Sequence, residues 1–598
     1  MMRDRYLMVD HQLEKVQGLQ VTKLMLLLCF IFSCSEKEGG IRPSGNTIPS
    51  MINIQTDLVR YNPGQAVLFS VDQPLPENVK VRYKYLHQII NEHAVSGDGW
   101  EWLPPSEDYR GYMAEVFTDG EEKVLGTIAI DVSGNWQKFP RYGFLSGYPQ
   151  MTKNEIETVI KNLAQHHING LQFYDWHYKH HQPLAGTAEN PDDVYQDIIG
   201  REIHFETVNQ YIKHAHDAGM KAMSYNLIYG ALKGASADGV SSSWYLYEDN
   251  DQQRINRHSL PQPPFISDIF VTNPAHKGWQ EYLIGENNKV YRALDFDGFH
   301  MDQLGNRNTE LYNGQGSAVD LKATFKLFTE AMKSAQPSKA LVLNAVNQYG
   351  QEQIAQAPVG FLYSEVWPPN SGFADLADII LNNHHYSDGS LNTVLAAYLN
   401  YDMADNKGVF NTPAVLLADA VIFAFGGAHL ELGEHMLGKE YFPNNNLMMR
   451  KDLELALVEY YDFLTAYENL LRDGGSFNEP YVTTNSFNIP LNNWPPKAGS
   501  VSVIGKEVEN RQVLHLINFK DANMLEWRDS NGSQNYPAVI MDIPITFSAS
   551  REVVKVWMAS PDIDGGASFS LDFTRQGSEV SFTVPSLHFW DMVVIEYQ

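Results

Sequence analysis

The spacing of apolar residues changes twice along the chain and divides it into three regions. From about Met51 to Asn135, short apolar runs alternate with polar positions, as in 79–83, and turn residues separate the runs. Successive side chains of a strand point to opposite faces, so this alternation predicts half-buried sheets. The same pattern returns after about Gly474, for example in 513–517. We therefore expect two β-sandwiches, at 51–138 and at 476–598.

The central region, residues 139–475, has a different pattern, in which short apolar runs alternate with stretches of helical periodicity. Predicted helices include 154–166, 205–218 and 321–335. The predicted strands are 142–145, 170–174, 221–225, 298–301, 340–344, 360–363, 394–398 and 428–432. Eight strands with helices between them predict an α/β fold of the (β/α)8 TIM barrel type. An open doubly wound sheet is the alternative, although no glycine-rich phosphate-binding motif follows any strand.

The first 50 residues have a pattern of their own. Lys23 precedes the apolar run 24–32, which is too short for a permanent membrane span and fits the core of a signal peptide. Residues 31–34, Ile-Phe-Ser-Cys, are similar to the lipobox of bacterial lipoproteins, whose cysteine is lipidated and becomes the mature N-terminus. We predict a lipoprotein signal peptide at 1–34, lipidation of Cys34 and a flexible linker at 35–50. An uncleaved anchor and an ordinary secretory signal are the alternatives.

The net charge and the positions of the cysteines limit which partners and which cellular compartments are possible. The chain has 72 acidic and 44 basic residues and a formal net charge of −28, which argues against nucleic acid and anionic membrane surfaces as partners. We therefore expect membrane attachment through lipid on Cys34 alone, at the outer membrane, on the cell surface or in the periplasm. Both cysteines, Cys29 and Cys34, lie in the predicted signal peptide, so the folded domains have no disulfide framework.

Two acidic residues stand where predicted strands enter their loops. Asp302 follows the fourth strand and Glu365 the sixth, 63 positions later. In a barrel the C-terminal ends of all strands open on one face, so the two carboxyl groups can approach each other. Glycoside hydrolysis needs such a pair, one ionised to attack the anomeric carbon and one protonated for the leaving oxygen. A structural hydrogen bond or a helix cap is the alternative for either residue.

Other polar and aromatic residues follow the same strand ends and could contact a sugar. Polar side chains could hold hydroxyl groups, and tryptophan rings could stack on the C–H faces of a sugar. Aromatic residues make up 12% of the chain, which suits a carbohydrate binder and equally a large β-rich core. The candidate substrate-binding residues are Asp175, Trp176, His177, Asn226, Trp367 and Glu431. Packing at the barrel mouth and loop capping are the alternatives for each.

The histidines do not predict a metal centre. None of the paired histidines has the helical two-His-plus-Glu spacing of a zinc hydrolase. A tighter group comprises His429, Glu431, Glu434 and His435, but strand alternation sends neighbouring side chains to opposite faces. We expect neither a catalytic metal ion nor another cofactor. Asp562 and Asp564, which precede two glycines, could cap a turn or weakly hold calcium, and the turn is favoured.

Several long motifs in the central region resemble glycoside hydrolase family 66, the dextranases and cycloisomaltooligosaccharide glucanotransferases. The resemblance covers 141–450, with motifs at 141–145, 173–177, 225–229, 297–305, 363–367, 410–417 and 426–444. It implies that Asp302 is the nucleophile and Glu365 the general acid/base, and that anomeric configuration is retained, with the carboxyl groups roughly 5–5.5 Å apart. It also implies an immunoglobulin-like N-terminal β-sandwich and a Greek-key C-terminal one.

The resemblance favours a dextranase, a retaining endo-hydrolase that would cut α-1,6-linked glucan and release isomaltooligosaccharides through a covalent glycosyl-Asp302 intermediate. The family's glucanotransferases usually carry a carbohydrate-binding insertion of roughly a hundred residues late in the barrel. Here Glu431 follows Glu365 by only 66 positions, too few for a further domain of that size.

Two alternatives remain beside the dextranase. Glucanotransferase or transglycosylase activity would follow if a sugar hydroxyl, in place of water, attacked the covalent intermediate. A non-catalytic glycan-binding surface lipoprotein would predict loss of one or both carboxyl groups, and both are present. In each case we expect a monomer whose partners are dextran and isomaltooligosaccharides.

Overall fold

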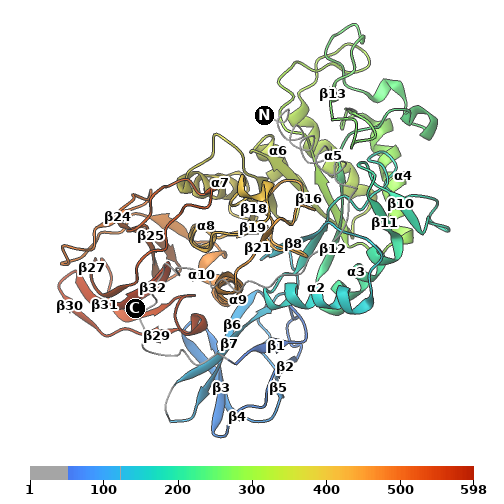
Figure 1. Ribbon diagram of the computed structural model, residues 1–598. Helices are drawn as coiled ribbons and strands as arrows, with labels where there is room; N and C mark the ends of the chain where they lie inside the picture. The colour runs from blue at the N-terminus through green and yellow to red at the C-terminus, as the bar shows by residue number, and fades with distance from the viewer. Residues whose placement is uncertain (1–51, 121–122) are drawn as a thin grey trace, which may run out of the picture.

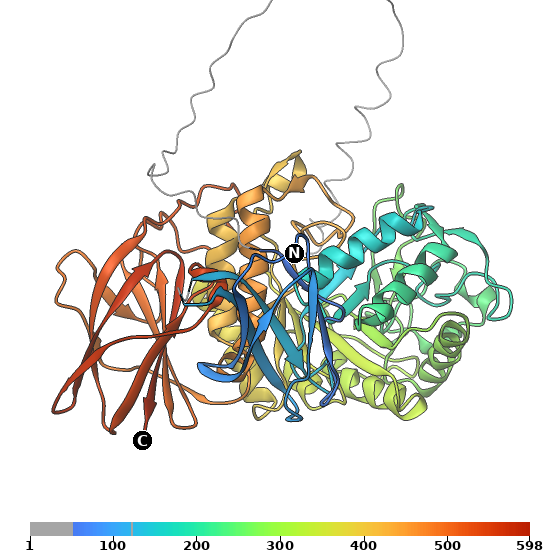
Figure 2. The same ribbon diagram turned by 90° about the horizontal axis from the view of Figure 1, so that it is seen from below.

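The computed structural model describes residues 52–120 and 123–598. They form a central α/β domain with an all-β domain on either side of it in the sequence. Figures 1 and 2 show the N-terminal domain (blue) and the C-terminal domain (orange to red) packed against the central domain. The predicted signal peptide at 1–34, the lipidation of Cys34 and the linker at 35–50 lie outside the described residues. Among the described residues, no helix has the length and apolar character that crossing a membrane requires.

Eight parallel strands form the sheet of the central domain, and each is hydrogen-bonded to the next in chain order. They are β8 (Tyr142–Leu145), β9 (Gly170–Phe173), β12 (Lys221–Leu227), β15 (Gly298–Asp302), β16 (Ala340–Val346), β17 (Leu362–Glu365), β18 (Thr393–Ala396) and β20 (Gly427–His429). The Phe144 amide donates to the Leu432 carbonyl (3.1 Å), which links the first strand to the segment after the last. The sheet is therefore a nearly closed parallel barrel, as predicted, and each predicted strand overlaps an observed one.

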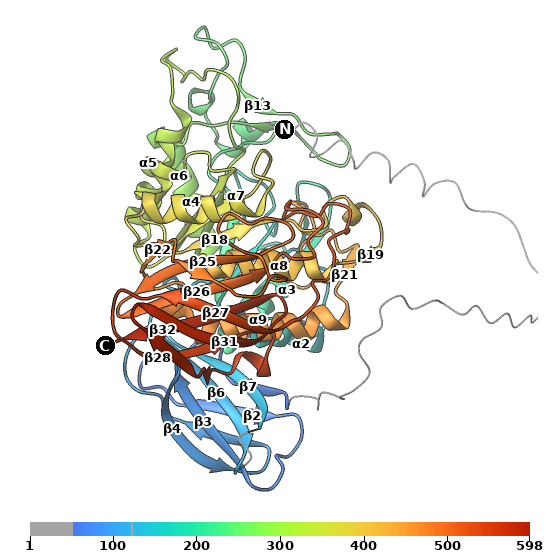
Figure 3. The ribbon, with the colours of Figure 1, turned by 90° about the vertical axis from the view of Figure 1, so that its left-hand side faces the viewer.

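Helices cover the outside of the barrel. In α2 a capping box between Thr152 and Glu155 fixes the first turn, and the buried residues Ile156, Ile160 and Leu163 form one apolar stripe. By contrast α8 buries all its residues, because it lies between strand β20 of the barrel and the C-terminal domain (Figure 3). The helices are α2 (Lys153–Gln165), α3 (Phe205–Asp217), α4 (Lys277–Ala293), α5 (Leu321–Ala335), α6 (Gln351–Ala355), α7 (Phe373–Tyr386), α8 (Thr412–Ala424), α9 (Lys451–Ala466) and α10 (Glu468–Leu471).

Three pairs of short strands lie in the connections of the barrel. They are β10 (Val194–Gln196) with β11 (Glu202–His204), β13 (Arg257–His258) with β14 (Ile269–Phe270), and β19 (Gly408–Val409) with β21 (Leu447–Met448). The connections after β9, β12 and β20 therefore contain short strands of their own. Residues from each of these connections line the site described below.

The N-terminal domain has two sheets around a core of its own, with the strand orders β1-β2-β5 and β4-β3-β6-β7. The strands are β1 (Ile54–Thr56), β2 (Val67–Val71), β3 (Val79–Tyr85), β4 (Gln88–Val95), β5 (Gly99–Trp102), β6 (Arg110–Thr118) and β7 (Val124–Val132). Arg141, just before β8, is fully buried and pairs with Asp131 of β7 (2.5 Å) and Glu468 of α10 (3.1 Å). The Arg141–Asp131 ion pair therefore ties the N-terminal domain to the barrel. The immunoglobulin-like identity of this domain stays a prediction.

The C-terminal domain also has two sheets around its own core. The first has the order β22-β25-β26-β32-β28-β29, with β24 beside β25, and the second β23-β27-β31-β30. The strands are β22 (Ser476–Asn478), β23 (Val482–Thr483), β24 (Leu491–Asn493), β25 (Val501–Val508), β26 (Arg511–Asn518), β27 (Ile540–Ser548), β28 (Val553–Ala559), β29 (Phe569–Ser570), β30 (Phe573–Gln576), β31 (Glu579–Leu587) and β32 (Trp590–Tyr597). Buried Lys506 donates to the Leu470 and Leu471 carbonyls at the end of α10 (3.0 and 2.8 Å), attaching the domain to the barrel. The Greek-key assignment stays a prediction.

Candidate active site

A cavity opens at the C-terminal ends of the barrel strands, where the βα connections begin. About 830 Å³ of space, part of it open solvent, lies between the residues that line it. Asp302, Asn344 and Glu365 line it from three neighbouring strands, β15, β16 and β17. The connections after β12 and β20 add further walls, formed by His258, Leu260, Phe265, Ile269, Glu440, Tyr441 and Phe442.

Asp302, the last residue of β15, accepts three hydrogen bonds. The Tyr225 hydroxyl donates to Oδ2 (2.7 Å), while Asn344 Nδ2 (2.9 Å) and the Gln303 amide (2.8 Å) donate to Oδ1. Burial and, to a lesser extent, the charge of Glu365 raise the pKa of Asp302 to about 6, although these donors act in the opposite direction. At neutral pH the carboxylate is therefore still mainly ionised, and its donors fix its orientation.

Glu365, the last residue of β17, faces the same cavity. The Tyr398 hydroxyl donates to Oε1 (2.9 Å), and Asn344 Nδ2 lies 3.5 Å from Oε2. The same nitrogen lies 2.9 Å from Asp302 Oδ1, so the two carboxylate oxygens cannot be further apart than the sum of these two distances. The two carboxyl groups therefore face one cavity and lie close enough to act on a single glycosidic bond.

Asp175 is the one predicted substrate-binding residue found among the described lining residues of the cavity. It follows β9 with a left-handed φ of 47°, a conformation that non-glycine residues rarely adopt. Burial raises the pKa of Asp175 to about 7, although the charge of Arg201 acts in the opposite direction. Near neutral pH this carboxyl group can therefore donate a hydrogen bond to a sugar hydroxyl or accept one.

Three other predicted substrate-binding residues, Trp176, His177 and Asn226, lie behind the cavity wall. Trp176 is fully buried, with its ring centroid 5.1 Å from that of Phe296, so its ring is packed into the core of this structure. His177 is also fully buried, with its ring 4.6 Å from that of His180. Asn226 contacts His180 twice at 2.8 Å, through Oδ1 to the ring Nδ1 and through Nδ2 to the carbonyl. Asn226 therefore positions His180, and it is His180 whose side chain lines the cavity.

Trp367 lies beside the cavity and is half-buried. Its ring is 5.5 Å from the ring of Tyr398 and 5.9 Å from that of Tyr401. Because Tyr398 donates to Glu365, Trp367 supports a group that touches the carboxyl pair. Its contact with a sugar stays a prediction.

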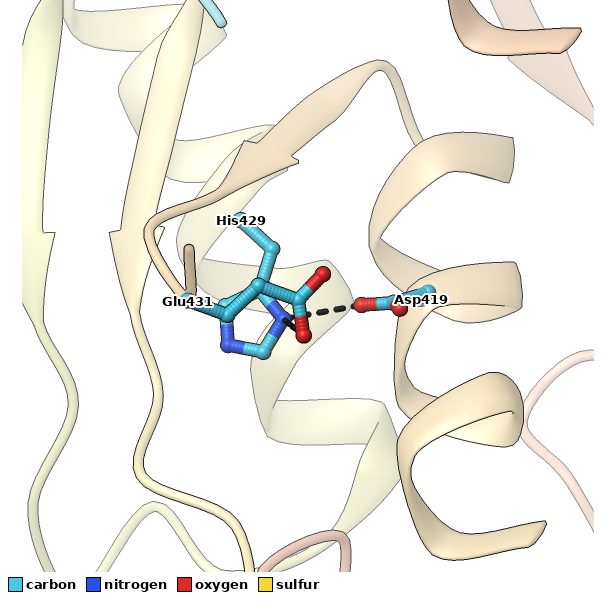
Figure 4. Close-up of side chains that lie close together, drawn as sticks. All are labelled: Asp419, His429 and Glu431. Carbon is cyan, nitrogen blue, oxygen red and sulfur yellow. Dashed lines mark hydrogen bonds and ion pairs between the residues drawn. The ribbon is translucent and has the colours of Figure 1, made fainter. Parts of the chain in front are cut away.

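Glu431 is not among the described lining residues of the cavity; it lies beside His429 and faces Asp419 of α8 (Figure 4), and it contacts α9 through Tyr461. His429 and Glu431 are two positions apart and therefore project to the same side of their segment. His429 Nδ1 lies 2.8 Å from Asp419 Oδ1 of α8 and 3.3 Å from Glu431 Oε2, and the Tyr461 hydroxyl of α9 donates to Glu431 Oε1 (3.1 Å). All three members of this buried triad, Asp419, His429 and Glu431, are sealed from solvent. Glu431, a predicted substrate-binding residue, is therefore placed outside the described lining of the cavity.

The buried triad carries its own counter-charge. Burial lowers the pKa of His429, but the carboxylates of Glu431 and Asp419 outweigh this effect and raise it well above its usual range. The other ring nitrogen, Nε2, donates to the Ala397 carbonyl (2.8 Å) just after β18. An imidazolium thus joins α8, β18 and β20, so the triad functions as a structural clamp.

Three residues that hold the carboxyl pair are absent from the sequence predictions: Tyr225, Asn344 and Tyr398. Each is the last residue of a predicted strand, 221–225, 340–344 or 394–398. Their position was therefore a usable signal, because strand ends of a barrel meet at the site. Their residue types gave none, since tyrosine and asparagine are common in ordinary loops.

Comparison with known sequences matches the chain to one family over most of its length. The family model described as glycosyl hydrolase family 66 matches residues 56–594. A cycloisomaltooligosaccharide glucanotransferase of Niallia circulans is 27% identical over an alignment of 707 positions, which covers 90% of this chain and 71% of that protein. A dextranase of Streptococcus salivarius is 23% identical over 579 aligned residues, covering 83% of this chain and 68% of that protein.

Among solved structures, a cycloisomaltooligosaccharide glucanotransferase of Paenibacillus sp., complexed with cycloisomaltoheptaose, matches with a TM-score of 0.84 at 24% identity. The match covers 91% of this chain and 99% of that one. It shows that the two chains share a fold.

Proposed function

Because the chain belongs to glycosyl hydrolase family 66, we propose that it hydrolyses internal α-1,6-glucosidic bonds of dextran with retention of configuration. The observation that supports this proposal most is the position of Asn344. Its Nδ2 contacts the carboxyl groups of both Asp302 and Glu365, which face one cavity. A dextranase among the relatives supports the substrate class.

In the first step Asp302 acts as the nucleophile. One of its oxygens forms a bond to C1 of a glucosyl unit while the bond from C1 to the leaving oxygen breaks. Glu365 transfers its proton to that oxygen, and the products are a shortened glucan and a covalent glycosyl-Asp302 intermediate. The donors from Tyr225 and Asn344 hold Asp302 in its attacking orientation.

In the second step Glu365 acts as the base. It removes a proton from water as the water oxygen bonds to C1, and the bond between C1 and Asp302 breaks to regenerate the carboxylate. The Tyr398 hydroxyl, 2.9 Å from Oε1, stabilises the ionised Glu365 that begins this step. Asp175 and His180, which also line the cavity, are placed to hold sugar hydroxyl groups.

A second candidate is cyclisation, in which a hydroxyl of the same glucan attacks the intermediate in place of water. The glucanotransferase relatives from Niallia circulans favour it. Alignment length favours hydrolysis: the 707 positions aligned with one glucanotransferase exceed the 598 residues of this chain, so that relative has segments without a counterpart here. The alignment with the dextranase covers 579 positions. We therefore place hydrolysis first.

Product analysis after incubation with dextran tests the proposal. Linear isomaltooligosaccharides are expected to dominate, and freshly released reducing ends should keep the α-configuration when followed by NMR. Cyclic products as the main species would replace hydrolysis with the glucanotransferase reaction. No product from dextran, with a folded protein, would contradict both activities and favour a non-catalytic glycan-binding lipoprotein.

We also propose that the protein is a lipoprotein anchored to the outer membrane through Cys34. The support is the lipobox-like sequence at 31–34 after the apolar run. Labelling cells with a fatty-acid analogue should label the wild-type protein and not Cys34→Ser, while Cys29→Ser serves as the matched control. Equal labelling of wild type and Cys34→Ser would contradict the proposal.

A further inference from the structure

The connection between β26 and β27 of the C-terminal domain extends from its own sheets to the barrel mouth. Within this connection, residues 519–539, the indole N–H of buried Trp527 donates to the Asn370 carbonyl (3.0 Å). The Asn400 amide donates to the Arg528 carbonyl (2.8 Å). The connection therefore binds the loops that follow β17 and β18, the first of which starts directly after Glu365.

The side chain of Arg528 contacts the residues that follow Glu365. Its Nη2 donates to the Val366 carbonyl (2.9 Å), and its guanidinium lies 5.1 Å from the ring centroid of Trp367 and 5.0 Å from that of Tyr401. A planar guanidinium can stack on aromatic rings and donate in its own plane at the same time, which an ammonium group cannot do. Arg528 therefore fixes the backbone and the ring next to the carboxyl group.

The guanidinium also acts on the site through its charge. Burial lowers the pKa of Arg528, and nearby acidic groups act in the opposite direction; these groups are Tyr401, Tyr398, Glu440 and Glu365. Electrostatic interactions are mutual, so the positive charge of Arg528 favours the ionised form of Glu365.

Other groups around the carboxyl pair set the balance. Asp302 opposes ionisation of Glu365 because both would be negative, and Tyr363 lies within electrostatic range of both. Lys439, 4.4 Å from the ring centroid of Tyr401, is a second cation on the same side. Lys439 also pairs with Asp405, which compensates its charge.

We propose that Arg528 is a positioning residue that the C-terminal domain supplies to the active site, where it orients the segment after Glu365 and favours the ionised state of this residue. The inference rests on the proposed function, because that state is the base of the second step. Loss of the charge should therefore slow proton removal from water more than the proton donation of the first step.

Replacing Arg528 by glutamine removes the charge and keeps a side chain of similar reach. On an aryl isomaltoside with a good leaving group, the first step needs little acid assistance, so Arg528→Gln should accumulate the glycosyl intermediate. We expect a kcat about tenfold lower with a fall in KM, a smaller loss than the ~10²–10⁴-fold expected when a general base is removed. Azide needs no base and should restore turnover, giving a glycosyl azide of retained configuration.

The pH dependence provides a readout that a merely structural role would not change. The alkaline limb of kcat/KM reports loss of the proton from the general acid, so in Arg528→Gln it should move to higher pH by about 0.5–1 unit. Arg528→Lys should keep this limb in place, because it keeps the charge. Arg551→Gln, which removes a guanidinium 3.9 Å from the Tyr597 ring in the same domain, is the matched control and should change neither readout.

The outcomes separate the inference from the proposed function. If wild type does not turn over any α-1,6-glucoside, the proposed function fails. If wild type is active but Arg528→Gln keeps the wild-type pH profile and gains nothing from azide, the inference fails and Arg528 is structural. If Arg528→Gln does not fold, the pH profile of Arg528→Lys is measured instead. An alkaline limb of kcat/KM that moves by about one pH unit in this variant, which keeps the charge, would overturn the role of charge.

Discussion

Two groups of buried acidic residues lie on the same barrel, and their surroundings give them different properties. Asp302 and Glu365 face a cavity and receive hydrogen bonds from uncharged donors, Tyr225, Asn344 and Tyr398. The buried triad is covered by α8 and α9 and contains its own cation, His429. The triad thus holds one imidazolium for two acids, and burial together with the charge of Glu431 raises the pKa of Asp419 to about 8, while burial and the charge of Glu365 raise that of Asp302 to about 6. Perturbed acids that open to a cavity indicate chemistry, and compensated acids sealed behind a wall indicate structure.

Substitution of either acid of the carboxyl pair is expected to have the largest effect, and this effect is on turnover. Asp302→Asn and Glu365→Gln should each lower kcat on dextran by at least about 10³-fold, because one removes the nucleophile and the other the proton donor. Circular dichroism should show an unchanged fold. Azide should restore activity to Asp302→Gly with an inverted product. Near-normal turnover in either carboxamide variant would remove the basis for calling the cavity pair catalytic.

For the triad the expected effect is on stability. His429→Gln removes the cation that lies beside two buried acids and should lower the free energy of unfolding by about 3–5 kcal/mol. The kcat of the folded fraction should change little, since the triad does not line the cavity. Urea unfolding with active-site counting measures both, and His385→Gln on the exposed surface is the control. A large loss of kcat at full folding, or a loss of wild-type stability with EDTA, would show that the triad is more than a clamp.

Neutralising Asp302 of the carboxyl pair should raise the free energy of unfolding, whereas loss of His429 from the triad should lower it. Since burial raises the pKa of Asp302 from 3.8 to about 6, the folded chain binds more protons than the unfolded chain between these values. Stability therefore falls as pH rises through this window, and Asp302→Asn should be about 1–3 kcal/mol more stable than wild type at pH 7. Below about pH 4 the gain should vanish. Thermal unfolding of wild type and Asp302→Asn at both pH values measures this difference in stability. An equal difference at both pH values would contradict its electrostatic origin.

The smallest effect is expected from the donor to Glu365. Tyr398→Phe removes one hydrogen bond to a charged group, worth about 1.5 kcal/mol or about tenfold in kcat. Stability should remain close to that of wild type because the ring still packs against Trp367. Steady-state kinetics on dextran, with Tyr386→Phe on α7 as control, measures the loss. An unchanged kcat would show that this donor does not assist the second step.

Much of the fold follows from local patterns. The eight barrel strands were predictable because an apolar run between turn residues is visible within a few positions, and α5 begins and ends where its periodicity predicts. Asp302 and Glu365 could be selected because each ends a strand, and strand ends converge in a barrel. Trp176 and Glu431 look equally suitable in sequence, yet one is packed into the core and the other lies in the buried triad.

The sequence by itself determined where the strands and helices lie and which acids reach the barrel mouth, because these properties depend on neighbouring residues. The tertiary structure alone decided that Asp419 of α8 meets His429 and that Arg528 of another domain stacks on Trp367. Such contacts join residues far apart in the chain. They depend on how covered elements pack, and side chains buried in a contact carry no mark of their partner in the sequence.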